Sequence, residues 1–236
     1  MPLDERVRER TWYHTIELAP GQATDGWWDH RPYMHRFGLP ERMEGMRALD
    51  VGTWDGFWAF EMERRGAEVV ALDVDDERDL DWPPRRRPDR YPDERRGAGF
   101  ALAKELLGSD VERFDLSIYD ALPEDLGTFD LVFCGSVIMH LRDQLLALER
   151  IANLCRGTFI SVEEYHRPLS LLPLAVSRFR APREKGVLFW LPNLRGWRGM
   201  IWAAGFDDVV RRDRFAMTAS DGLKVHHVVH HARKRP

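Results

Sequence analysis

The segment ALDVGTWDGFWAFEMERRG, Ala48–Gly66, decides the fold, because a buried strand runs directly into a glycine turn and then into a helix. Short apolar runs rich in β-formers, at 46–51 and 67–74, flank a helical pattern that ends at its final glycine. Together they predict a strand, a helix and a second strand. The turn also carries Trp54 and Asp55, and its ligand must tolerate both.

The alternation of strands and helices continues along the chain. We expect further helices at 100–108, 142–157 and 194–205 and further strands at 111–118, 128–135, 158–164, 206–213 and 222–232. Strands that alternate with helices predict a mainly parallel sheet covered on both faces. In such a sheet a ligand binds at the carboxyl ends of the strands, where the strand order reverses.

The composition indicates one globular domain, because 44% of the 236 residues are hydrophobic and 31% are charged. The formal net charge of −4 gives no overall attraction for a polyanion such as nucleic acid. The first ten residues alternate in charge, and no apolar run reaches the roughly 20 residues of a membrane span. We therefore expect a cytoplasmic protein with no membrane partner. Cys134 and Cys155 form no CxxC pair and are expected to be buried free thiols.

Two segments fit no strand–helix repeat. Residues 1–45 are rich in aromatic and turn residues, and we interpret them as a cover over the ligand crevice of a domain formed by residues 46–236. Residues 76–99 combine prolines with alternating charges, a composition that excludes a regular element. We expect this second segment to be a surface insertion.

The glycine loop satisfies DxGxxxG but lacks the middle glycine of the GxGxxG dinucleotide fingerprint. A dinucleotide presses its pyrophosphate against bare backbone at a helix N-terminus, and Trp54 obstructs that approach. Asp55 adds a negative charge where phosphates would lie. A nucleoside that has no phosphate and carries positive charge fits better. S-Adenosylmethionine has a sulfonium and an ammonium on an adenosine, so it is the expected cofactor, with S-adenosylhomocysteine as its product.

Carboxylates follow two of the predicted strands at the ligand edge. Asp73 ends the second strand, where its two acceptor oxygens match the ribose diol, and Asp120 follows the third strand as a partner for the adenine amino group. Either aspartate can instead be a plain turn or capping residue. The predicted cofactor-binding residues are Asp50, Gly52, Thr53, Trp54, Gly56, Asp73, Val74, Ile118, Tyr119, Asp120, Gly135 and, in the cover segment, Trp27.

Three residues are candidates for proton removal from an acceptor: His140 after the fourth strand, Glu163 at the end of the fifth, and His14 in the cover segment. Each residue has a structural alternative: His140 can cap the next helix, Glu163 can be part of a polar rim, and His14 can pack over the edge of the sheet. Transfer from a sulfonium has a good leaving group, so positioning alone can suffice. The run HHVVHH, His226–His231, alternates its imidazoles across a strand. We predict solvated histidines on an edge or terminal strand, and no metal site.

Three stretches carry a family resemblance: LDVGTWDGFWAFEMERRGAEVVALDVDD, SIYDALPEDLGTFDLVFCGSVIMHLRDQLLALE and FWLPNLRGWRGMIWAAGFDDV. In this order and strand context they resemble the class I S-adenosylmethionine-dependent methyltransferases over most of the chain from Met46 onward. The resemblance implies a Rossmann-like, doubly wound α/β sheet of seven strands in the order 3-2-1-4-5-7-6, with strand seven antiparallel. It also implies a cofactor site at the loop Asp50–Gly56 and methyl transfer.

Within that class, WYHTIEL, TDGWWDHR and FWLPN are similar to the wobble-uridine tRNA carboxymethyltransferase-like branch. That branch implies a lysine in the N-terminal segment and a tyrosine before the histidine that follows strand four. This chain has Met139 at the second position and no lysine before Lys104. Arg31 can replace the charge, but a thioether cannot replace the hydrogen bond of a phenol. We therefore favour S-adenosylmethionine and methyl transfer over the carboxylated donor.

Three functions stay open from the sequence: a methyltransferase for a small-molecule acceptor, a tRNA wobble-uridine modifying enzyme, and an adenosyl-binding protein without turnover. Net acidity favours the small molecule. A path for RNA would need the arginine runs at 85–87 and 211–214 on one rim with Arg178, Arg180 and Arg183.

Overall fold

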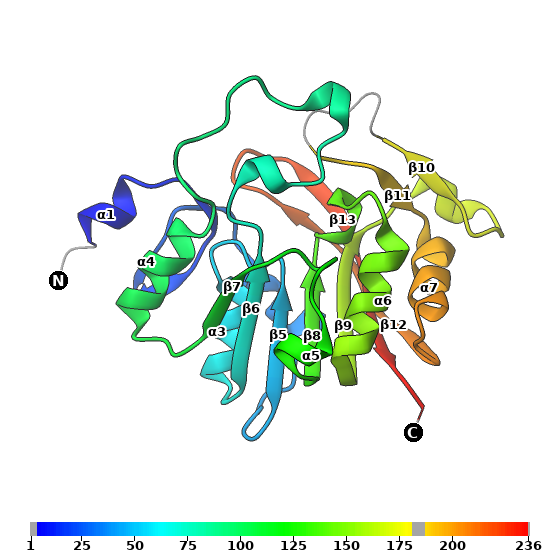
Figure 1. Ribbon diagram of the computed structural model, residues 1–236, viewed down its shortest axis with the longest axis horizontal. Helices are drawn as coiled ribbons and strands as arrows, with labels where there is room; N and C mark the ends of the chain where they lie inside the picture. The colour runs from blue at the N-terminus through cyan, green and yellow to red at the C-terminus, as the bar shows by residue number, and fades with distance from the viewer. Residues whose placement is uncertain (1–3, 181–186, 236) are drawn as a thin grey trace.

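The computed structural model describes residues 4–180 and 187–235, and its centre is a seven-stranded sheet (Figure 1). In chain order its strands are β5 (Arg47–Val51), β6 (Glu68–Asp73), β7 (Glu112–Asp115), β8 (Phe129–Gly135), β9 (Cys155–Glu164), β12 (Asp208–Thr218) and β13 (Lys224–Arg233). They lie side by side in the order β7-β6-β5-β8-β9-β13-β12. β13 is antiparallel to both of its neighbours, and the other pairs are parallel. The predicted order 3-2-1-4-5-7-6 is confirmed.

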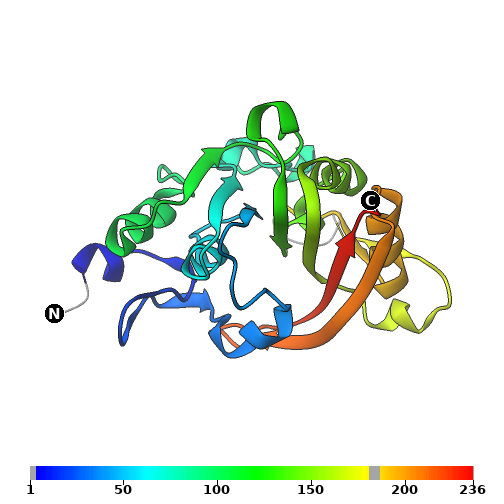
Figure 2. The same cartoon turned by 90° about the horizontal axis from the view of Figure 1, so that it is seen from below.

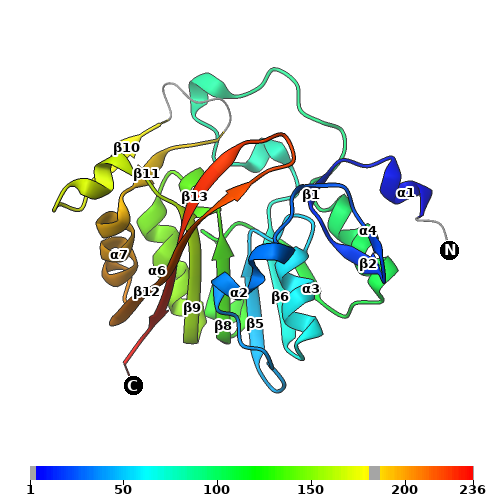
Figure 3. The same ribbon diagram turned by 180° about the vertical axis from the view of Figure 1, so that it is seen from behind.

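Helices cover both faces of this sheet (Figures 1 and 3). One face carries α5 (Pro123–Leu126), α6 (Gln144–Leu154) and α7 (Leu194–Ala203), and the other carries α2 (Met34–Phe37), α3 (Phe57–Arg64) and α4 (Ala98–Leu107). Successive strand residues point to opposite faces, so Ala48 packs into the core beneath α3 and Leu49 into the core beneath α6. Seen from below, the sheet lies between these two layers (Figure 2).

The N-terminal segment lies over the face that carries α3 (Figure 3). It contains α1 (Glu5–Arg8), β1 (Trp12–His14), β2 (Glu17–Ala19), β3 (Gln22–Ala23), β4 (Gly26–Trp28) and the 3-10 turn η1 (Arg31–Tyr33). The carboxylate of Asp55 accepts the backbone N–H groups of Tyr13, at 2.6 Å, and His14, at 3.1 Å. Asp55 is only 2% exposed. The prediction that Asp55 faces the ligand is therefore wrong, because its charge is committed to β1.

Replacement of Asp55 by alanine should loosen β1 from the domain. Each hydrogen bond to a buried carboxylate contributes about 1.5–3 kcal/mol, so we expect the amides of Tyr13 and His14 to exchange with solvent about 10- to 100-fold faster. Hydrogen-exchange mass spectrometry measures this effect. Asp25→Ala, an exposed change in the same segment, is the control. Unchanged exchange at Tyr13 in Asp55→Ala would show that other contacts hold the segment.

The insertion at 76–99 is more regular than predicted. It forms two 3-10 turns, η2 (Glu77–Asp79) and η3 (Pro84–Arg86), and α4 already begins within its last residues. The side chain of Asp76 caps η2 by accepting the N–H of Arg78. The segment then returns to the sheet, where the N–H of Arg96 donates to the carbonyl of Asp75 at 3.0 Å. Outside these short elements the segment is irregular, as its prolines and alternating charges predict.

The last strand, β13, is an inner strand of the sheet. The prediction of solvated histidines on an edge is therefore wrong for His227 and His230, which are 5% and 1% exposed. The long strand β12 pairs along the whole of β13 and covers it. Cys134 and Cys155 are buried free thiols, as predicted.

Two structural absences hold across residues 4–180 and 187–235. In these ranges, no cluster of three or more histidine, cysteine or acidic side chains has a geometry that could bind a metal ion. No helix within the same ranges has both the length and the apolar character of a membrane span.

Candidate functional site

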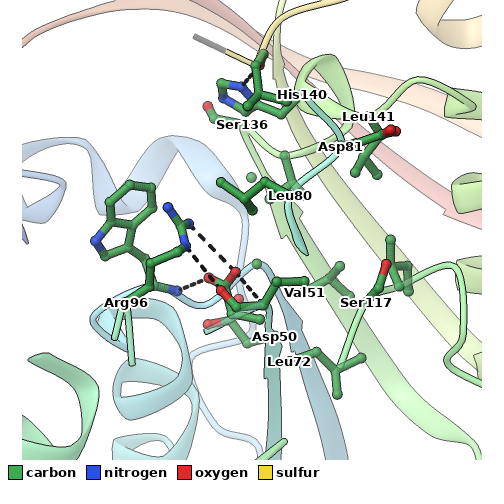
Figure 4. A pocket seen from close by; sticks show the side chains of 18 of the residues that line it. Asp50, Val51, Leu72, Leu80, Asp81, Arg96, Ser117, Ser136, His140 and Leu141 are labelled. Carbon is green, nitrogen blue, oxygen red and sulfur yellow. Dashed lines mark hydrogen bonds and ion pairs between the residues drawn. The ribbon is translucent and has the colours of Figure 1, made fainter. Parts of the chain in front are cut away.

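A cavity of about 310 Å³ opens at the carboxyl ends of the parallel strands, at the predicted ligand edge (Figure 4). This volume is in the range of pockets that hold small molecules. Its walls come from the loops after β5, β6, β7 and β8, from the N-terminal segment and from the insertion. Figure 4 shows Asp50 and Leu72 at one end, Ser136 and His140 at the other, and Ser117, Asp81 and Leu141 along one side.

The carboxylate of Asp73 holds the glycine loop against the end of β6. Its Oδ2 accepts the N–H of Trp54 at 2.7 Å, and its Oδ1 accepts the N–H of Val74 at 2.8 Å. Gly52 has a φ of 75°, and a Cβ at this position would lie 2.3 Å from the side chain of Val137. The loop therefore requires glycine here, both for its conformation and for its approach to the loop after β8.

Arg96, which is not among the predicted site residues, enters the pocket from the insertion. Its guanidinium lies 3.8 Å above the ring of Trp54, and its Nη2 lies 3.7 Å from Oδ1 of Asp73. Its Nε donates to the carbonyl of Val74 at 3.1 Å. Tyr13 also stacks on Trp54, with the ring centroids 4.4 Å apart. The tryptophan of the glycine loop thus joins the N-terminal segment and the insertion in one wall of the pocket.

Asp50 is a buried carboxyl group with an unfilled hydrogen-bonding position. It lines the pocket and is 1% exposed, and its Oδ2 has no hydrogen-bond partner in the described part of the chain. Burial raises the pKa of Asp50 to about 7. Because a buried oxygen without a donor is costly, this atom marks where a ligand's donor or cation would be stabilised.

The loop after β8 places two polar side chains at the far end of the pocket. Ser136 has a φ of 57°, and its hydroxyl lies 3.2 Å from Nε2 of His227. His140 lies in the 3-10 turn η4 (Ile138–His140), and its Nδ1 is 2.5 Å from the carbonyl oxygen of Val187. A carbonyl only accepts, so Nδ1 carries the proton and Nε2 is the acceptor nitrogen. Burial lowers the pKa of His140, which favours this neutral form.

Glu163 lies beneath this loop and does not line the pocket. Its Oε1 accepts the N–H groups of Val137, at 3.2 Å, and Ile138, at 3.1 Å. The residue is completely buried, and burial raises the pKa of its carboxyl group to about 8. Glu163 therefore stabilises the loop after β8. This position does not support the prediction that its carboxylate removes a proton from an acceptor.

Glu163 should make stability depend on pH. Because its pKa is raised from 4.5 to about 8, its contribution is fully present below pH 4.5 and is lost as the pH rises towards 8. Glu163→Gln keeps an acceptor for both amides and does not titrate. We expect the variant to gain stability over the wild type between pH 5 and 8, by up to about 5 kcal/mol. Urea denaturation at pH 5 and pH 8 measures this gain. Glu149→Gln, a change at an exposed residue, is the control. If the difference in free energy of unfolding between Glu163→Gln and the wild type is the same at both pH values, the raised pKa of Glu163 is contradicted.

Nine of the predicted site residues line the pocket. They are Asp50, Gly52, Trp54, Asp73, Val74, Ile118 and Gly135, with the candidate bases His14 and His140. Burial lowers the pKa of His14 to about 3, so this imidazole is neutral. Gly56 and Thr53 lie in the loop but outside the pocket wall, and Trp27 packs edge-on against Tyr13 at 5.8 Å.

Asp120 and Tyr119, two of the predicted cofactor-binding residues, do not line the pocket. Asp120 is exposed, because the turn that its N–H closes on the carbonyl of Ser117 carries the carboxylate to the surface. The hydroxyl of Tyr119 donates at 2.9 Å to Asp81, which lines the pocket, although Tyr119 itself does not. Leu116 and Ser117 line the pocket in their place, beside the predicted Ile118.

The structure places the two arginine runs on different elements. Residues 85–87 lie in the insertion, in and just after η3, and residues 211–214 lie on β12, an edge strand of the sheet. Arg180 is bound to Glu164 at 3.0 Å, and Arg183 lies outside the described residues.

Comparison with known proteins gives the same fold and names a family. The chain is 27% identical over 187 residues to a ubiquinone biosynthesis O-methyltransferase of Xylella fastidiosa, which covers 70% of this chain and 65% of that protein. It is 26% identical over 196 residues to a tRNA U34 carboxymethyltransferase of Desulforapulum autotrophicum, which covers 80% of this chain and 53% of that protein. The chain thus spans less than two thirds of the length of either relative.

Among solved structures, the N-terminal domain of EvdMO1 with S-adenosylhomocysteine bound has a similar fold. The TM-score is 0.63 at 18% identity, over 98% of this chain and 94% of that one. The model of the methyltransferase domain family matches residues 30–210, well over half of the chain. The resemblance to the class I methyltransferases is thereby confirmed, and the chain belongs to the methyltransferase domain family.

Proposed function

We propose that this chain binds S-adenosylmethionine in the pocket at the ends of β5 to β8 and transfers its methyl group to a small-molecule acceptor. The observation that carries the proposal is the combination, in one cavity, of the Asp73 carboxylate, the close-packed Gly52 and Oδ2 of Asp50, which has no hydrogen-bond partner among the described residues. Relatives named as methyltransferases and a similar fold holding S-adenosylhomocysteine support it.

The pocket residues fit the parts of this cofactor. Asp73 would accept from the ribose hydroxyls, because a carboxylate offers two acceptor oxygens to a diol. Leu116, Ser117 and Ile118 would lie against the adenine. Asp50 would take the ammonium, which supplies the donor and the positive charge that its buried oxygen lacks. The sulfonium would then lie towards Ser136 and His140.

A small acceptor is favoured by the size of the cavity and by the net charge of −4. A second function, carboxymethyl transfer to tRNA, is supported by the likeness to the tRNA U34 carboxymethyltransferase. Against it stands Met139, whose thioether offers no donor to an extra carboxylate on the cofactor. Its backbone carbonyl accepts the N–H of Phe189 at 3.1 Å, and Met139 itself does not line the pocket.

A label-transfer experiment separates these functions. The protein is incubated with S-adenosylmethionine labelled in the methyl group, first with a fractionated metabolite extract and then with bulk tRNA. We expect label in a small-molecule fraction only. Label in tRNA, together with tRNA binding that weakens steeply as salt rises, would transfer the assignment to the RNA function. Cofactor binding without label in any fraction would leave the adenosyl-binding protein as the correct description.

A further inference from the structure

Ser136 occupies a strained position in the wall of the pocket. It directly follows β8, and its φ of 57° is rare for a residue with a side chain. Its N–H donates to the carbonyl of Val162 at 2.8 Å, and Glu163 binds the next two N–H groups. These bonds hold the strained backbone in place. Strain that the surroundings maintain in this way is typical of functional positions.

The hydroxyl of Ser136 connects the pocket to a buried imidazole. His227 lies behind the pocket wall, with its Nε2 3.2 Å from Oγ of Ser136. Its ring stacks on Phe215 at 5.8 Å and meets Trp28 edge-on at 6.5 Å. Nδ1 of His227 has no hydrogen-bond partner within residues 4–180 and 187–235. The packing fixes the ring, with Nε2 directed at the serine that lines the pocket.

His227 is a neutral imidazole at pH 7, because burial lowers its pKa to about 4. The titratable groups around it are Glu164, directly opposite on β9, His226 on its own strand, and His30 in the N-terminal segment. The Glu164 carboxylate is bound to Arg180. One ring nitrogen of a neutral imidazole is an acceptor, and Nε2 is the nitrogen that the serine hydroxyl can reach.

Resting on the methyl transfer proposed above, we propose that Ser136 and His227 form a proton relay for an acceptor that carries an O–H group. The acceptor oxygen forms the bond to the methyl carbon, and the electron pair of the broken carbon–sulfur bond stays on sulfur. The acceptor proton passes to Oγ of Ser136 while the serine's own proton passes to Nε2 of His227. The imidazolium returns this proton to solvent through Ser136 after the product leaves.

The chemistry of the acceptor explains why a buried imidazole suffices. The hydroxyl proton becomes strongly acidic as its oxygen gains a third bond, so a weak base can remove it. A serine alone could not hold the extra proton, which is why the neighbouring acceptor nitrogen matters. An acceptor atom that loses no proton on methylation has no use for this pair, so the relay is consistent with an alcohol or a phenol as acceptor.

The relay can be tested without cofactor or acceptor, by ¹⁵N NMR of the histidine side chains. We expect His227 at pH 7 to carry its proton on Nδ1 and to have an unprotonated Nε2. Ser136→Ala should move the Nε2 resonance, because it removes the donor. A proton on Nε2, or an Nε2 resonance that ignores Ser136→Ala, would overturn the relay even if methyl transfer is correct.

Kinetics then test the relay with the acceptor that the label-transfer experiment identifies. Ser136→Ala and His227→Gln should each lower kcat about 100-fold, with the affinity for S-adenosylmethionine unchanged. His226→Gln is the matched control, because this neighbouring imidazole contacts Arg167 instead of the pocket wall. An unchanged kcat, or a loss confined to cofactor affinity, would overturn the relay. If no acceptor is labelled, the proposed function fails, and the NMR result still shows whether Nε2 of His227 accepts a hydrogen bond from Ser136.

Discussion

Asp73→Ala should weaken the binding of S-adenosylmethionine by at least about 100-fold. The carboxylate would make two hydrogen bonds to the ribose, and each such bond to a charged group contributes about 1.5–3 kcal/mol. The same oxygens accept the N–H groups of Trp54 and Val74 and lie near Arg96, so the variant also loosens the loop. Both effects reduce affinity.

Calorimetric titration of the variant measures this loss, and two further variants show its origin. Asp73→Asn keeps one acceptor oxygen without the charge and should bind with intermediate affinity. Asp120→Ala should bind like the wild type, because that carboxylate is exposed and lies outside the pocket. Equal losses in Asp73→Ala and Asp120→Ala would contradict the site described here.

Gly52→Ala should destabilise the protein by about 2–5 kcal/mol and abolish cofactor binding. A left-handed φ costs a residue with a side chain roughly 1–2 kcal/mol, and a clash in a packed region adds about 1–3 kcal/mol. The new Cβ would lie 2.3 Å from Val137, whose N–H is bound by Glu163 and cannot easily withdraw.

Two variants separate strain from clash in this prediction. Gly21 has nearly the same φ, 73°, and no atom of residues 4–180 or 187–235 lies within 4 Å of its Cβ position, so Gly21→Ala should show only the conformational cost. Adding Val137→Ala to Gly52→Ala removes the colliding methyl groups and should restore part of the stability. Thermal or urea denaturation measures all three. If Gly52→Ala costs no more than Gly21→Ala, the close approach of the two loops is wrong.

The fold could be predicted because its signals are local. Most of the parallel strands are apolar runs, and β6 and β8 end in the turn residues Asp73 and Gly135; β7 (ERFD) is the exception. The order of the strands then follows from the family resemblance, and the position of the pocket follows from that order. Strand ends were less predictable: β12 runs to Thr218, beyond the predicted end at Asp213, because its pairing with β13 extends it.

The side of the backbone to which a polar residue points could not be predicted. Asp55 and Asp120 stand in turns at the correct edge of the sheet, yet one turns towards β1 and the other towards solvent. Whether a loop carboxylate enters a pocket depends on backbone angles within a few residues. The conformation of Ser136 is hidden for the same reason, because serine seldom adopts a positive φ.

Contacts between distant segments explain the remaining differences. Arg96 stands among prolines and charges and resembles a solvated residue, but its ring partner Trp54 and ion partner Asp73 lie far earlier in the chain. His227 belongs to a histidine run that has no nearby hydroxyl in sequence. Ser136 lies beside it because the sheet places the end of β8 close to β13. Trp54, an unusual residue in a glycine loop, was the one signal in the sequence that could have pointed to Arg96, because the face of an exposed tryptophan ring favours a cation such as a guanidinium.

The most direct test is calorimetric titration of the wild-type protein with S-adenosylmethionine, its carboxylated form and NAD under the same conditions. The proposed site predicts that S-adenosylmethionine binds at one site per chain and that NAD does not bind. Binding of the carboxylated form alone would favour carboxymethyl transfer. Binding of NAD, with no binding of either adenosyl donor, would contradict the central claim.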